Sequence, residues 1–287
     1  MKNIWIIGCG DIGRRVAKRI ADLYQNRDYR TSALVQTEKS ARLCEKLGIT
    51  PIIYNLDNHQ PFDKKSFKEA EIYYFAPPPK TGVSDDRLHN FLNQLEQAPR
   101  KVVLISTTGV YGDCQGEWVD ESRSINPQTD RAKRRVAAEQ TLENWAASHD
   151  KPYIILRVPG IYALDRLPLD RLRKKLPVVQ ASEAAYTNRI HADDLAQICI
   201  EAMNSDLSAE VFNTTDGDPG TMVDYFNQIA DYSGLERPQQ ISLEEAKKSL
   251  SAGMLSYAQE SRRIGNSKLL KLLGIKLKHP TLASTLK

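Results

Sequence analysis

The sequence predicts an α/β fold in which a doubly wound parallel sheet carries a smaller C-terminal lobe. Three observations support this. The apolar run Ile4–Ile7 leads directly into a glycine-rich turn. Further short apolar runs alternate with helical segments, which is typical of a parallel sheet covered on both faces. After Arg157 the chain becomes rich in prolines and charges, as suits a lobe of loops and short elements.

Composition limits the class of protein. The chain has 287 residues, 41% hydrophobic and 26% charged, which suffices for a full core. Its formal charge of +4 is too small to indicate nucleic-acid binding, and no apolar stretch reaches membrane-span length. We therefore expect a cytoplasmic protein. We also expect no metal site and no disulfide framework, because the cysteines are widely spaced: Cys9, Cys44, Cys114 and Cys199.

The glycine-rich turn is the first element that indicates a ligand. Gly8, Gly10 and Gly13 form a G-x-G-x-x-G motif between a strand and a helix. In that context the first glycine permits a tight turn, the second lets backbone approach a pyrophosphate, and the third lets helix and strand pack closely. Asp11 and Ile12 begin the helix whose N-terminus would face the anion. The motif predicts an NAD(P)-binding Rossmann fold; the alternative is a tight turn without a ligand.

The remaining elements follow in order. Strands are predicted at Ile4–Ile7, Thr31–Val35, Pro51–Tyr54, Ile72–Phe75, Val102–Ser106 and Tyr153–Arg157. A helix near Asp193–Met203 and a strand near Val211–Asn213 would return to the main sheet. Residues 1–157, with 190–214 returning, are therefore predicted as the dinucleotide-binding domain. Residues 158–189 and 215–287 would form the substrate-binding lobe.

Later motifs resemble the extended short-chain dehydrogenases/reductases, the nucleotide-sugar epimerase/dehydratase group. The segment 102–112 (VVLISTTGVYG) is similar to that family's strand and active-site loop. Leu156–Tyr162 and Arg189–Leu195 resemble its L-R-x-x-x-x-Y and I-H-V-x-D segments, in the family's order. The resemblance covers nearly the whole chain. It implies an NAD(P)-dependent enzyme that transfers hydride.

The chain departs from this family at the catalytic Tyr-x-x-x-Lys motif. Counting back from Ala137-Ala138-Glu139 places Arg131 at the tyrosine position and Arg135 at the lysine position. A guanidinium stays protonated, so Arg131 cannot replace the tyrosine acid. The chain is therefore identified as an atypical member.

The cofactor residues are predicted partly from the second strand and partly from the resemblance. Gln36, not a carboxylate, directly follows Val35 at the end of the second strand, so the sequence does not indicate a strong preference for NAD. Gln36, with the cations Arg14 and Lys39, favours NADP as the cofactor, and NAD stays possible. The resemblance implies that Asn55 and Leu56 flank the adenine. It further implies contacts with the rest of the cofactor by Ala76, Pro77, Pro78, Ser106, Pro159, Gly160 and Ile161.

The catalytic residues are less well specified. Thr107 occupies the family's Ser/Thr position, which hydrogen-bonds a substrate oxygen. Tyr111 is a candidate proton donor, although in most relatives this tyrosine tethers the loop. Tyr162 and His191 are weaker candidates, and His191 is more readily interpreted as a packed, hydrogen-bonded residue.

A basic run at 131–135 begins a predicted helix. Its cations oppose the helix dipole, so the arrangement favours an anion, with Arg131 and Arg135 one turn apart on the substrate side. The alternative is a solvated basic face with Asp130 as N-cap. Farther along, Val136, Leu142 and Trp145 have the spacing of a core helix or of a homodimer helix.

Two functions are compatible with these motifs. The first is an NAD(P)-binding oxidoreductase or epimerase-like enzyme acting on a small anionic substrate such as a nucleotide sugar. The second is a catalytically silent dinucleotide-binding sensor or scaffold, favoured by the missing Tyr/Lys pair. Nucleic-acid binding through 131–135 is weakly supported, because no aromatic stacking platform accompanies the charges.

Overall fold

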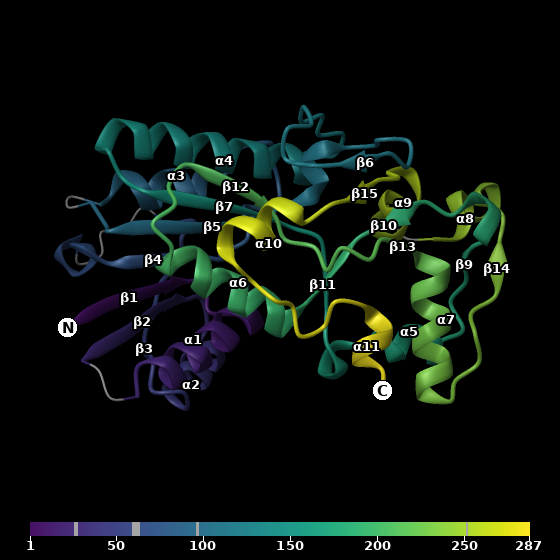
Figure 1. Cartoon of the computed structure of the whole chain (residues 1–287), viewed down its shortest axis with the longest axis horizontal. Helices are drawn as coiled ribbons and strands as arrows, with labels where there is room; N and C mark the ends of the chain where they lie inside the picture. Colours follow the sequence, from purple (N-terminus) through teal and green to yellow (C-terminus); the bar gives the residue numbers. More distant parts are fainter. Residues whose placement is uncertain (26–27, 59–63, 96–97, 251) are drawn as a thin grey trace.

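The computed structural model describes residues 1–25, 28–58, 64–95, 98–250 and 252–287. Within these residues a central sheet of seven parallel strands has the order β12-β7-β5-β4-β1-β2-β3 (Figure 1). The strands are β1 (Lys2–Ile7), β2 (Tyr29–Val35), β3 (Thr50–Ile53), β4 (Glu71–Tyr74), β5 (Lys101–Thr107), β7 (Tyr153–Val158) and β12 (Glu210–Asn213). The chain winds outward in both directions from β1 and β4, so the predicted doubly wound sheet is confirmed.

Helices cover both faces of this sheet (Figure 1). They are α1 (Asp11–Leu23), α2 (Glu38–Glu45), α3 (Asp86–Asn93), α4 (Asp130–His149) and α6 (Ala192–Asn204). One apolar core contains residues of α1, α2 and α6, and another contains residues of α3 and α4. Leu142 and Trp145 of α4 are buried in the second core, which confirms the core interpretation of that helix.

The sequence explains why these elements form. Ile4, Ile6 and Ile7 of β1 are fully buried, as a continuous apolar strand covered on both faces must be. In α1 the buried residues Ile12, Val16 and Ile20 recur every four positions and form one apolar stripe. Helix α4 begins after Thr129, whose side chain accepts a hydrogen bond from the Ala132 amide; the expectation of Asp130 as N-cap was wrong.

The remaining elements build the C-terminal side of the molecule. Short strand pairs join β6 (Trp118–Val119) to β15 (Arg263–Ile264), β8 (Gly160–Tyr162) to β11 (Arg189–His191), β9 (Val178–Val179) to β14 (Gln240–Ile241), and β10 (Tyr186–Thr187) to β13 (Gly220–Thr221). The helices are α5 (Leu169–Arg173), α7 (Met222–Ser233), α8 (Leu243–Ser249), α9 (Ala252–Gln259), α10 (Ser267–Leu273) and α11 (Leu282–Thr285).

This side has a small apolar core of its own, which includes Tyr162, Leu172, Val223 and Phe226. Leu269 of α10, by contrast, packs into the core beneath the main sheet. Among the described residues, none of the helices has the length and apolar character needed to cross a membrane.

Candidate functional site

A cavity of about 210 Å³ lies at the carboxyl ends of β1, β2 and β4. Seven of the predicted cofactor residues line it: Gly8, Gly10, Gln36, Asn55, Leu56, Ala76 and Pro77. They come from four separate chain segments, which the parallel sheet brings to one edge. We call this space the glycine-turn cavity.

The three glycines of the turn differ in what surrounds them. Gly8 has φ +89°, and a Cβ there would lie 2.6 Å from the Ala76 nitrogen, so no side chain fits. At Gly13 a Cβ would lie 3.0 Å from Cγ2 of Ile6, which reflects close packing of α1 on β1. A Cβ at Gly10 meets nothing within 4 Å. Packing within the protein therefore does not require a glycine at position 10, whereas a ligand bound in the open space beside it would.

Other predicted residues around the turn lie outside the cavity lining. The Ile12 side chain packs in the core, and the Asp11 carboxylate forms ion pairs with Arg15 and Arg166 at 3.3 and 2.8 Å. Any contact of these two residues with a ligand would be through their backbone. Arg14 and Lys39 are also absent from the described lining.

Two residues that the sequence did not predict, Ser40 and Arg87, also line the glycine-turn cavity. Arg87 donates two hydrogen bonds of 2.6 Å to the Asp57 carboxylate and one of 2.9 Å to the Pro77 carbonyl. It lowers the pKa of Asp57 by hydrogen bonding. Arg87 thus fixes the loop that follows β4.

A larger cavity of about 500 Å³ adjoins the first, and Pro77 lines both. Its lining includes the predicted residues Pro78, Ser106, Thr107, Arg131, Arg135, Pro159, Gly160 and Ile161. We call it the arginine cavity because four arginines are among its described lining residues. Lys80, Arg131, Arg134, Arg135 and Arg262 are opposed by one carboxylate, Glu260.

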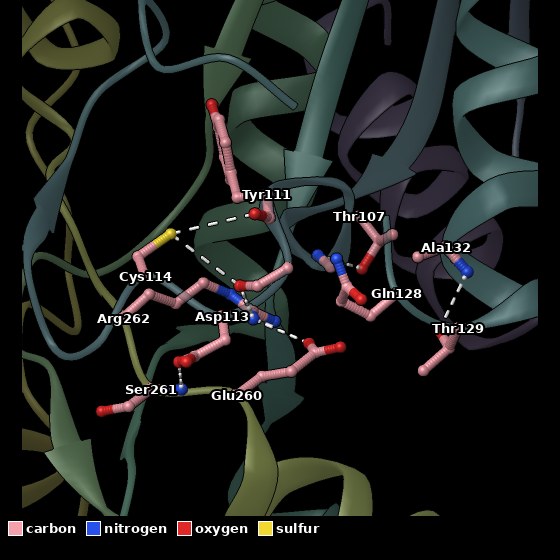
Figure 2. Close-up of polar contacts among 12 residues, drawn as sticks. Thr107, Tyr111, Asp113, Cys114, Gln128, Thr129, Ala132, Glu260, Ser261 and Arg262 are labelled. Atoms are coloured by element: carbon pink, nitrogen blue, oxygen red, sulfur yellow. Dashed lines mark hydrogen bonds and ion pairs between the residues drawn. The ribbon is translucent and has the colours of Figure 1, made fainter. Parts of the chain in front are cut away.

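The cations of the arginine cavity have few partners. Arg262 pairs with Glu260 at 2.7 Å and donates to the Gly112 carbonyl, which ties the C-terminal segment to the loop after β5 (Figure 2). Arg135 donates to the Ile105 carbonyl at 3.0 Å. Burial lowers the pKa of Arg135, as expected for a cation removed from water. Four positive charges therefore face this cavity without a described carboxylate in ion-pair contact.

Thr107 ends β5 on the wall of the arginine cavity. Its Oγ1 accepts a hydrogen bond of 3.2 Å from the Gly109 amide. Because a hydroxyl has one hydrogen to donate in addition to its lone pairs, Thr107 can still donate to a ligand oxygen.

Tyr111 is not in the described lining of either cavity. Its hydroxyl is buried, donates to Asn213 Oδ1 at 2.9 Å and accepts from Arg157 Nη1 at 2.9 Å. Arg157 in turn forms a buried ion pair with Glu139 at 2.8 Å, and Ser106 Oγ donates to the same carboxylate. This buried network joins the ends of β5, β7 and β12 to α4.

Tyr162 and His191 are in the described lining of neither cavity. Tyr162 belongs to the small C-terminal core, and His191 is the N-cap of α6. The Tyr162 ring packs edge-on to His191, and burial raises the pKa of its hydroxyl. His191 stacks on His279 with ring centroids 3.7 Å apart, and the Asp193 amide donates to its Nδ1 at 3.2 Å. Asp193 itself pairs with Arg15, so these side chains cap α6 and dock the C-terminal segment.

We expect stability to depend on His191 below neutral pH. Burial and the neighbouring His279 lower the pKa of His191, so the unfolded chain binds the proton more readily. This contribution to the free energy of unfolding is complete above about pH 6.5 and is lost as the pH falls toward the folded pKa. His191→Asn keeps an N-cap acceptor without the titration. Urea unfolding between pH 8 and 5 should therefore show a shallower pH dependence for His191→Asn; equal slopes would contradict this expectation.

Several residues of the site could not be found from the sequence. Tyr186, Asn188 and Glu260 line the arginine cavity but belong to segments with no interpretable motif. Arg134 lies in the basic run, but the sequence predicted only Arg131 and Arg135 as substrate-binding residues. Only the fold shows that Arg134 also borders the cavity.

Comparison with protein families supports the resemblance stated from the sequence. Residues 86–214 match the model of the NAD dependent epimerase/dehydratase family. The match spans β5, the loop carrying Thr107, helix α4 and strand β12. No curated protein matches the chain.

Solved structures share the fold at low sequence identity. A functionally unknown conserved protein from Silicibacter pomeroyi DSS is 24% identical, with a TM-score of 0.83 over 100% of this chain and 97% of that one. UDP-glucuronic acid 4-epimerase from Bacillus cereus, in complex with NAD, is 16% identical, with a TM-score of 0.78 over 100% and 96%. UDP-N-acetylglucosamine 4-epimerase from Methanobrevibacter ruminantium M1, in complex with UDP-N-acetylmuramic acid, is 16% identical, with a TM-score of 0.76 over 99% and 96%.

Proposed function

We propose that the chain is an NAD(P)-dependent oxidoreductase or epimerase-like enzyme, and the match of residues 86–214 to the model of the NAD dependent epimerase/dehydratase family supports this proposal. Its substrate would be a small anion such as a nucleotide sugar. The observation that carries the proposal is the contact between the two cavities at Pro77. The glycine-turn cavity suits the adenosine and pyrophosphate parts of a dinucleotide, and the arginine cavity suits the nicotinamide part together with an anionic substrate.

The residues of the glycine-turn cavity fit the adenosine and pyrophosphate parts of the cofactor. Gly10 leaves room for a phosphate, and α1 directs its N-terminus there. Among the described lining residues of this cavity there is no carboxylate that would repel a 2′-phosphate. Gln36 and Ser40 supply polar contacts, so we favour NADP over NAD. The nicotinamide would lie against Pro159, Gly160 and Ile161.

When bound, the cofactor would supply reversible hydride transfer, and the protein would position the substrate. Thr107 would donate its hydroxyl hydrogen to the substrate oxygen while accepting from the Gly109 amide. Arg131 and Arg135 would attract the anionic part of the substrate. The proton that is taken up or released with the hydride would be exchanged with a water molecule in the arginine cavity, because neither arginine can give up a proton.

Variants that remove the hydroxyl of Tyr111 or of Thr107 distinguish a structural role from a catalytic role for each residue. Tyr111→Phe removes one buried hydroxyl and should lower the free energy of unfolding by about 1–2 kcal/mol, with less than about a threefold change in kcat. Thr107→Val removes the acceptor of the Gly109 amide at a partly exposed position and should lower the free energy of unfolding by about 0.5–1 kcal/mol. It should also reduce kcat at least roughly tenfold. Chemical denaturation and steady-state kinetics measure the two effects. A larger loss of kcat in Tyr111→Phe than in Thr107→Val would make Tyr111 the catalytic residue.

Turnover with a panel of nucleotide sugars and anionic keto compounds, in the presence of NADP or NAD, tests the proposal. Reduction, oxidation or epimerisation of any member supports the enzyme. Dinucleotide binding with no turnover across the panel supports the catalytically silent sensor instead. That alternative draws on Arg131 and Arg135 at the Tyr/Lys positions and on the enclosed Tyr111 hydroxyl.

A further inference from the structure

Arg134 carries a buried charge on the wall of the arginine cavity. Its residue surface is only 8% exposed. The guanidinium donates one hydrogen bond, from Nη1 to the Gly82 carbonyl at 2.6 Å, and its Nε has no described partner. No described carboxylate pairs with it. Among the residues that the structure describes, a side chain with five donors thus has one acceptor.

This arrangement is costly unless a ligand completes it. Removing a guanidinium from water without a counter-ion is strongly unfavourable, and a carbonyl oxygen neutralises none of its charge. Arginine is the side chain best suited to phosphate recognition, so a buried guanidinium without a counter-ion on a cavity wall indicates a candidate anion site. Arg134 is therefore a better marker of an anion site than Arg131, which is exposed and solvated.

The surroundings of Arg134 are also suited to an anion. It lies in the second turn of the 20-residue helix α4, whose N-terminus borders the same cavity through Thr129 and Arg131. Lys80 approaches from the loop after β4. The nearest acid in the sequence, Asp130, is exposed and faces Lys133 at 3.9 Å.

We propose that Arg134, with Arg131 and Lys80, binds a phosphate group of the substrate in the arginine cavity. A phosphate offers several acceptor oxygens and close to two negative charges, which matches this cluster of donors better than a single carboxylate does. The inference rests on the proposed function, since it specifies the anion that the substrate carries. The buried anchor is Arg134, while Arg135, which donates to the Ile105 carbonyl, would add positive charge to the same cavity.

Calorimetric titration of the full-length protein with inorganic phosphate, at low ionic strength, tests this site. A Gly10→Ala background removes phosphate binding at the glycine turn, so the remaining signal belongs to the arginine cavity. Arg134→Gln should weaken phosphate binding at least about tenfold, and Arg134→Lys should restore part of it. Lys133→Gln is the matched control, because it removes the same charge from the neighbouring exposed position and should change the affinity less than about twofold.

Three results would overturn the inference: no phosphate binding in the Gly10→Ala protein, equal losses in Arg134→Gln and Lys133→Gln, or no loss in Arg134→Gln. If Arg134→Gln does not fold, Arg131→Gln replaces it, since Arg131 is exposed and should weaken phosphate binding severalfold. NADP binding to the unmodified protein is measured in parallel. If phosphate does not bind but NADP binds normally, only the phosphate site is refuted. If NADP does not bind, the proposed function is refuted.

Discussion

Replacing Gly10 by alanine is expected to abolish most dinucleotide binding while the fold stays intact. The alanine methyl group would occupy the open space beside Gly10, where the pyrophosphate is expected. A pyrophosphate displaced from the turn would lose hydrogen bonds from backbone amides. Because a hydrogen bond to a charged group is worth about 1.5–3 kcal/mol, the loss of two would weaken binding by roughly a hundredfold or more. Because Gly10 has φ −75° and its Cβ position is free, the stability cost should stay near about 1 kcal/mol.

The matched control is Gly253→Ala, which adds a methyl group at another glycine with nothing within 4 Å of its Cβ position. Gly253 belongs to α9, in the C-terminal part of the chain. Calorimetry with NADP and thermal unfolding should show normal binding and stability for this variant. Unchanged NADP affinity in Gly10→Ala would show that the dinucleotide does not approach this turn.

Replacing Arg157 by methionine is expected to have the largest effect on stability. The substitution leaves the Glu139 carboxylate buried without its guanidinium partner, and it also removes a donor to Tyr111. Breaking such a buried pair costs about 3–5 kcal/mol of the free energy of unfolding. Ser106, the residue before Thr107, donates to the same Glu139 carboxylate. Loss of Arg157 should therefore also make the strand ends that form the arginine cavity less ordered.

Denaturant unfolding measures this loss against two further variants. Arg157→Met combined with Glu139→Met should recover much of it, because the double variant buries no unpaired charge. Arg123→Met breaks an exposed ion pair with Glu117 and should cost less than about 1 kcal/mol. A loss for Arg157→Met as small as that for Arg123→Met would contradict the importance of the buried network.

The sequence was most informative about elements whose rules are local. The alternation of apolar runs with helices predicted the order and parallel character of the main strands, because both follow from short-range pattern. The glycine turn could also be interpreted from local sequence alone. Seven predicted cofactor residues share one cavity. Strand ends from distant segments meet there because parallel strands all place their carboxyl ends at one edge.

The features that depend on tertiary contacts could not be predicted in this way. Tyr111 was a reasonable candidate acid until the fold placed its hydroxyl between Asn213 and Arg157. The carbonyl that accepts the hydrogen bond of Arg134 belongs to Gly82, which is 52 residues away in the sequence. Tyr186 in β10 and Glu260, which follows α9, reach the arginine cavity from segments whose positions are set by packing.

Titration of the purified protein with NADP and with NAD, followed by calorimetry, tests the central claim most directly. The expected result is saturable binding of one dinucleotide per chain, tighter for NADP than for NAD and strongly weakened in Gly10→Ala. Absence of binding by either dinucleotide at millimolar concentration would contradict the assignment of the glycine-turn cavity, and with it the proposed function.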